Sequence, residues 1–136
     1  MWRHLAFALA ILAGIQDAQA TIVSASLSHA GQALTRKGQW YRFGLGHLPQ
    51  DSRGQVTGLS WQINSLTPWP QLPLLLLCHD SDCRRLDSVA GRSRHFATQT
   101  SRGEWSVFIA LAGAGTQQPS LRVTGISLTV DVRSGK

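Results

Sequence analysis

The chain has 136 residues, with 13 Lys and Arg against 7 Asp and Glu, a net charge of +6 and two cysteines. This length suits one domain behind a short leader, and no apolar stretch reaches the roughly 20 residues that a membrane-spanning helix needs. The positive charge suits acidic proteins or anionic lipid headgroups. The features described next indicate that the chain leaves the cytoplasm. An exported chain rarely meets nucleic acid, so we do not expect nucleic acid as a partner.

Residues 1–20 have the three parts of a cleavable export signal. Arg3 supplies the positive start, residues 5–15 form an apolar run, and Ala18-Gln19-Ala20 offers small residues to a signal peptidase. A membrane anchor or a buried helix is the alternative, but the run is too short for an anchor. We expect cleavage before Thr21, which leaves residues 21–136 as a single domain with no membrane insertion.

The apolar residues of this domain recur at every second position, which is typical of strands with one buried face. The clearest runs, in chain order, are Val23-Ala25-Leu27, Tyr41-Phe43-Leu45, Leu59-Trp61-Ile63 and Trp105-Val107-Ile109-Leu111. Glycine-rich or polar turns separate them, and no window shows a helical repeat. The sequence predicts an all-β fold, an antiparallel sandwich of about seven or eight short strands.

The last strand changes phase. Leu121 and Val123 point one way, whereas the alternating apolar residues from Ile126 to Val132 follow the opposite phase. A shift of one residue would send half of these side chains into water. We therefore expect a β-bulge or a bend between sheets near Gly125.

Two cysteines remain in the exported domain, Cys78 and Cys83, with four residues between them. In an oxidising compartment an even count predicts a disulfide, and a four-residue hairpin loop would place the two residues opposite each other. A metal site that includes His79, Asp80 and Asp82 is the alternative, but a single C-x4-C does not match structural zinc spacings. We expect the two aspartates to be turn residues and His79 to be exposed.

The histidines and carboxylates of the domain form no recognisable catalytic pattern. No serine lies in a G-x-S-x-G elbow, and the glycines near residue 113 lack the lysine of a phosphate loop. Asp80 and Asp82 share a hairpin tip, whereas glycosidase carboxylates face each other across a cleft. The sequence predicts no enzyme, no catalytic or metal site and no cofactor.

Candidate binding residues are an aromatic side chain in a loop and a group of arginines. Trp69 lies between two prolines, where its indole either anchors a partner or covers the end of the core. Trp61 and Trp105 alternate with polar residues and are core positions, whereas either Trp40 or Tyr41 must face outward. The basic residues Arg84, Arg85, Arg92 and Arg94 form either one positive patch or a solvated sheet face.

The central segment resembles the hallmark region of the flagellar protein FlhE family, over about residues 56–132. The resemblance is carried by Trp61, Thr67-Pro68-Trp69-Pro70, Leu74 to Leu77, Cys78, Cys83, Leu86-Asp87 and Gly91, followed by Phe96, Trp105, Phe108 and residues 119–123. It implies a periplasmic accessory of the flagellum that binds rod, hook or export-apparatus proteins, as a chaperone or to restrain proton leakage. Only the two cysteines carry over as family residues.

Two further readings compete with this one. A sandwich that binds carbohydrate or envelope polymer would use Trp69 or Trp40 as a stacking platform. A metal-binding periplasmic protein is the weaker option, because a disulfide would consume both thiolates.

Overall fold

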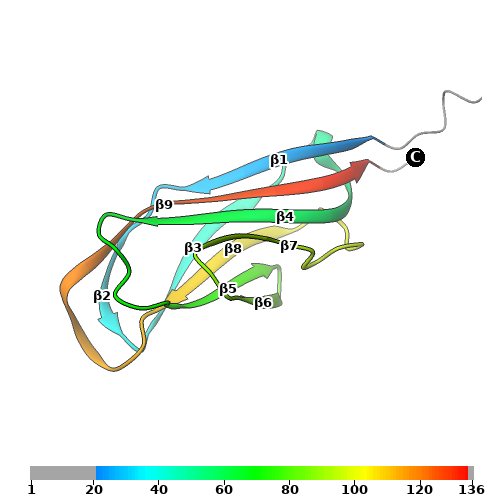
Figure 1. The fold of residues 1–136 in the computed structure, drawn as a ribbon. Helices are drawn as coiled ribbons and strands as arrows, with labels where there is room; N and C mark the ends of the chain where they lie inside the picture. Colours follow the sequence, from blue (N-terminus) through cyan, green and yellow to red (C-terminus); the bar gives the residue numbers. More distant parts are fainter. Residues whose placement is uncertain (1–20, 135–136) are drawn as a thin grey trace, which may run out of the picture.

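The computed structural model describes residues 21–134, so the predicted signal peptide lies outside the described residues. Two antiparallel sheets pack against each other as a sandwich (Figure 1), and the predicted all-β class is confirmed. The described part of the chain contains nine strands, slightly more than predicted, and one short 3-10 turn, η2 (Gln50–Ser52).

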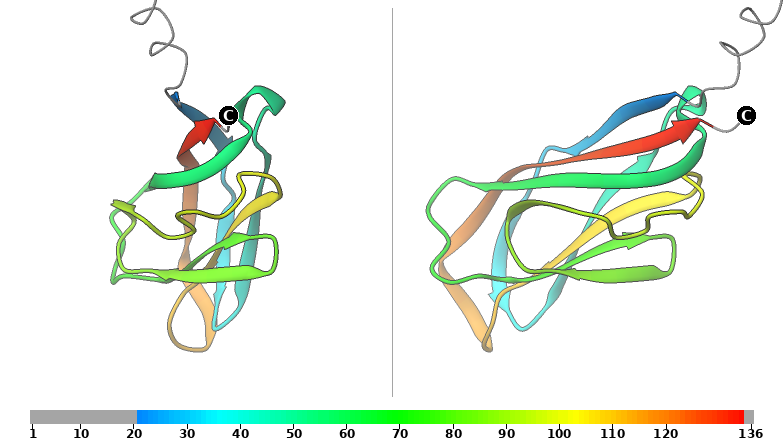
Figure 2. Two further views of the ribbon diagram at one scale, coloured as in Figure 1. Left: turned by 90° about the vertical axis from the view of Figure 1, so that its right-hand side faces the viewer. Right: turned by 45° about the vertical axis from the view of Figure 1, so that its right-hand side comes forward.

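The larger sheet has five strands and the smaller has four. The five-stranded sheet runs in the order β1 (Ile22–His29), β9 (Gly115–Ser134), β4 (Gly54–Ser65) and β7 (Ala90–Ser93), with β2 (Ala33–Lys37) paired to the first part of β9. The four-stranded sheet runs in the order β3 (Trp40–His47), β8 (Glu104–Ala110), β5 (Leu74–His79) and β6 (Asp82–Leu86). Figure 2 shows the twist of both layers.

Side chains from the facing sides of both sheets form one core. The predicted inward positions of β4 and β8 are all buried, and Trp105 and Phe43 are fully enclosed. Trp61 also lies in the core, where its ring passes over Gly91 on β7 and its Nε1 donates to the Ser88 carbonyl at 2.9 Å. A side chain at residue 91 would press on this ring, so the glycine makes room for the indole.

The predicted irregularity near Gly125 is confirmed. Gly125 pairs with Asn64, but the next pair joins Ser65 to Val123, so Thr124 is an extra residue on β9. Before this bulge β9 pairs with β2, and after it β9 pairs with β1. Leu121 and Ile126 are both buried although they differ in phase, because the bulge resets the side-chain alternation.

Candidate functional site

The hairpin of β5 and β6 carries the predicted disulfide. Cys78 on β5 lies opposite Cys83 on β6 with the two α-carbons 4.0 Å apart, and the predicted bridge is confirmed. The prediction of a four-residue loop is wrong, because His79 and Asp82 also pair and leave a turn of two residues. Asp80 takes a φ of 54°, a left-handed value that aspartate tolerates better than most residues.

The prediction that His79 is exposed is also wrong. Its side chain is only 5% exposed and stacks on Trp105, with ring centroids 4.2 Å apart and planes at 13°. The imidazole Nε2 lies 2.6 Å from the carbonyl oxygen of Arg102, to which it donates. Because His79 belongs to the ladder and pairs with Trp105, its ring points into the sandwich instead of into solvent.

The hairpin tip is also tied to the start of β8. The Asp80 backbone amide donates to the Glu104 carbonyl at 2.8 Å, and the Asp80 carboxylate accepts from the Glu104 amide at 2.8 Å. Asp80 is therefore a structural turn residue, as predicted. The prediction that Asp82 is also a turn residue is wrong, because it pairs with His79 as the first residue of β6. The tip and the segment 99–104 form one connected unit.

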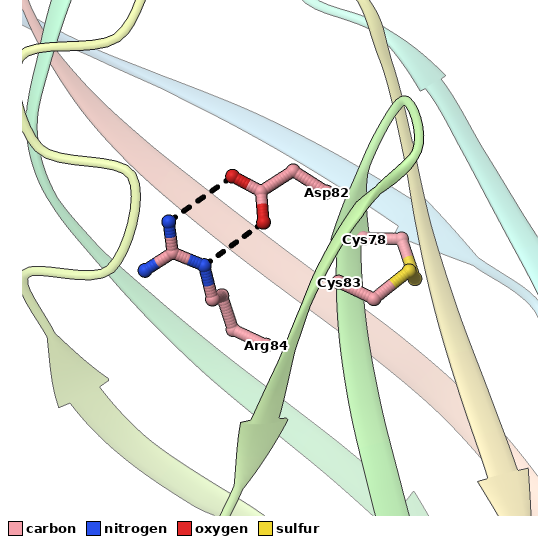
Figure 3. The surroundings of a disulfide bond; sticks show 4 residues. All are labelled: Cys78, Asp82, Cys83 and Arg84. Atoms are coloured by element: carbon pink, nitrogen blue, oxygen red, sulfur yellow. Dashed lines mark hydrogen bonds and ion pairs between the residues drawn. A yellow bond between two sulfur atoms is a disulfide. The ribbon is translucent and has the colours of Figure 1, made fainter.

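Asp82 and Arg84 form an ion pair on the side of β6 opposite to the disulfide (Figure 3). Arg84 donates twice to the carboxylate, at 2.9 and 3.1 Å, and the Gln99 amide donates a third bond at 2.9 Å. The bonds from Arg84 and then Gln99 lower the pKa of Asp82 to about 2. The Arg84 guanidinium also lies 5.0 Å above the ring of Phe96.

The four predicted arginines do not form one patch. Arg84 and its neighbour Arg85 point to opposite sides of β6, whereas Arg92 lies on β7 in the other sheet. Arg85 and Arg92 nevertheless line one hollow of about 480 Å³ across the open edge of the sandwich. Arg84 is engaged by Asp82, and Arg94 does not line this hollow.

Trp69, the predicted loop anchor, is half-buried and packs against the core. Of the two uses that the sequence left open, covering the end of the core is the one its contacts show. By contrast Trp40 is 47% exposed on β3, while its neighbour Tyr41 is half-buried. The Tyr41 hydroxyl accepts the backbone amides of Thr35 and Arg36.

The outward side of the four-stranded sheet carries a row of apolar side chains that sequence reasoning did not identify as a surface. Trp40, Ala110 and Leu74 are aligned across three strands. In the next row Phe108 and Leu76 lie between Arg42 and Arg85. We call Trp40, Leu74, Leu76, Phe108 and Ala110 the outer apolar face.

The outward side of the five-stranded sheet has the opposite character. Ser24 donates to Asp131 at 2.6 Å, and Ser26 and Thr129 are hydrogen-bonded at 3.0 Å. Further hydroxyl and amide side chains continue this polar row on β4 and β9, namely Ser60, Gln62 and Ser127. The two outward sides of the sandwich therefore differ sharply in hydropathy.

The sequence feature that could have indicated the outer apolar face is the unbroken leucine run 74–77, because half of these side chains must face outward in a strand.

In residues 21–134 no three His, Cys, Asp or Glu side chains come together as a metal-ion site. The same residues contain no helix that is long and apolar enough to cross a membrane.

Comparison with known proteins points to one family. The family model described as flagellar protein FlhE matches residues 27–133, from within β1 to within β9. A crystal structure of FLHE has a similar fold, with a TM-score of 0.75 and 24% sequence identity over 83% of this chain and 98% of that one. No curated protein matches the chain.

Proposed function

Because the chain belongs to the flagellar protein FlhE family, we propose that it is a non-enzymatic periplasmic accessory of the flagellum that binds rod, hook or export-gate proteins. The observation that carries the proposal is the family match, which spans nearly the whole sandwich, from residue 27 to residue 133. Binding of this kind would serve a chaperone-like role or limit proton leakage through the export apparatus.

Two features support the periplasm as the compartment. Residues 1–20 read as an export signal. The Cys78–Cys83 disulfide is of a kind that persists where thiols are oxidised and is rare in the cytoplasm.

The contacts made by the polar groups of the hairpin support the non-enzymatic part of the proposal. Asp82 is held by Arg84 and Gln99, and His79 donates to a backbone carbonyl beneath the hairpin. These contacts tie the hairpin to segment 99–104. Groups committed to such contacts stabilise the fold and are poor candidates for proton transfer.

The test is binding of the oxidised protein to purified rod, hook and export-gate proteins from the same source, measured by biolayer interferometry. We expect saturable binding to at least one of these components and none to filament protein. If no rod, hook or gate component binds the correctly oxidised protein, the proposed partners are wrong.

A carbohydrate- or envelope-polymer-binding sandwich is the alternative function. The observation in its favour is Trp40, whose indole is 47% exposed beside Leu74 and could stack on a sugar ring. Retention on immobilised peptidoglycan or glycans that disappears in Trp40→Ala, and survives in Trp69→Ala, would support it over flagellar binding.

A further inference from the structure

The outer apolar face has the exposure of a surface that a partner covers. Trp40 is 47% exposed and Leu74 is 36% exposed, and Leu76 and Phe108 in the next row of the sheet are partly exposed. Ala110 lies beneath its two large neighbours and is only 3% exposed. Single exposed leucines are common on protein surfaces and indicate no function. An aligned group of large apolar side chains forms a contiguous patch, and such patches mark interaction sites.

The face is hollowed at one point. Trp40, Leu74, Leu76 and Arg85 line a depression of about 170 Å³ whose floor includes Leu75. At about 30 Å³ per water this corresponds to roughly five or six waters, which is room for one large apolar side chain. A pocket that takes one anchoring side chain is the usual centre of a protein–protein contact.

The two arginines that flank the face differ in whether they have an ion-pair partner. Arg42 is paired with Glu104 at 3.1 Å. Arg85 makes neither an ion pair nor a side-chain hydrogen bond with any residue of 21–134. Its guanidinium therefore offers a planar donor group, suited to a carboxylate, at the edge of an apolar hollow.

From these observations we infer that the outer apolar face is a docking surface for a segment of a partner protein in which a large apolar side chain lies beside Asp or Glu. The apolar side chain fills the hollow and the carboxylate pairs with Arg85. A second copy of this chain is a poorer fit, because the chain carries a net charge of +6 and would bring like charge to the interface. The inference rests on the proposed function for the identity of the partner, but not for the location of the surface.

The test measures the binding of two sets of overlapping synthetic peptides to the purified oxidised protein. One set covers the rod, hook and export-gate proteins of the source, and the other contains unrelated peptides of matched composition. The face variants are Leu74→Ser and Arg85→Glu. Their matched controls are Ile22→Ser, an exposed aliphatic residue on β1, and Arg122→Glu on β9.

The expected result is binding of peptides that combine a large apolar residue with a carboxylate. Each face variant should weaken binding at least about tenfold, which corresponds to about 1.4 kcal/mol, while the controls bind like the wild type. Arg85→Glu should in addition shift the preference towards peptides in which Lys replaces Asp or Glu. Circular dichroism of all four variants checks that the sandwich is intact.

The remaining outcomes separate the surface from the partner. Flagellar peptides that bind Leu74→Ser and Arg85→Glu as well as the wild type would overturn the surface and leave the proposed function standing. Selective binding of unrelated peptides alone would support the surface and count against the flagellar partners. Absence of binding to both sets would overturn the inference, as would dimerisation or adsorption to phosphatidylglycerol vesicles that Leu74→Ser abolishes.

Discussion

His79 is expected to contribute more to stability than its position in a hairpin tip suggests. His79→Ala removes a stack on Trp105 and the donor to the Arg102 carbonyl. A buried aromatic stack contributes about 1 kcal/mol and a hydrogen bond contributes about 1 kcal/mol. The void left by the ring adds roughly another 1 kcal/mol, within the range of large-to-small substitutions. The free energy of unfolding should therefore fall by about 3 kcal/mol.

Urea unfolding followed by tryptophan fluorescence measures this loss. In a thermal melt it corresponds to a decrease in Tm of roughly 12 °C, at about 4 °C per kcal/mol for a domain of this size. His79→Phe keeps a ring on Trp105 and fills the void but lacks the donor, so it should recover about 2 kcal/mol of the loss. His47→Ala, at an exposed histidine on β3, is the control. A loss below about 0.5 kcal/mol in His79→Ala, the usual size of a surface effect, would refute the structural role.

Three further predictions concern the hairpin and the turns. Because its arginine partner holds the pKa of Asp82 at about 2, below its ordinary value of 3.8, the pair stabilises the fold above pH 4 and the effect is lost as the pH falls towards 2. In Asp82→Asn the urea midpoint should therefore change less between pH 4 and pH 2 than in the wild type, and an unchanged pH dependence would contradict this. Replacing Cys78 and Cys83 together by serine should cost about 2 kcal/mol, since the closed loop is short; failure to fold at all would show a larger role. Gly31→Ala should cost more than about 3 kcal/mol in urea unfolding, because the new methyl group meets a backbone carbonyl of β9. Gly115→Ala has nearly the same φ but open space, so equal losses in the two variants would rule out the steric argument.

The accuracy of the sequence predictions follows from the range of the interactions involved. Strand positions such as Leu59, Trp61 and Ile63 were predictable because alternation is a local property of an extended chain with one buried face. The bulge near Gly125 was predictable for the same reason, since a change of phase within one strand must be absorbed somewhere. The family resemblance depended on an ordered set of such local features.

The sequence by itself thus determined the all-β class, the disulfide and the positions of most strands. Tertiary structure alone decided what covers each strand, because burial depends on segments that are distant along the chain. His79 is buried only because Trp105 and Arg102 lie against the hairpin. The leucine run 74–77 has no period, so only the pairing of β5 with β8 and β6 shows that Leu75 enters the core while Leu76 joins an outward apolar row with Phe108.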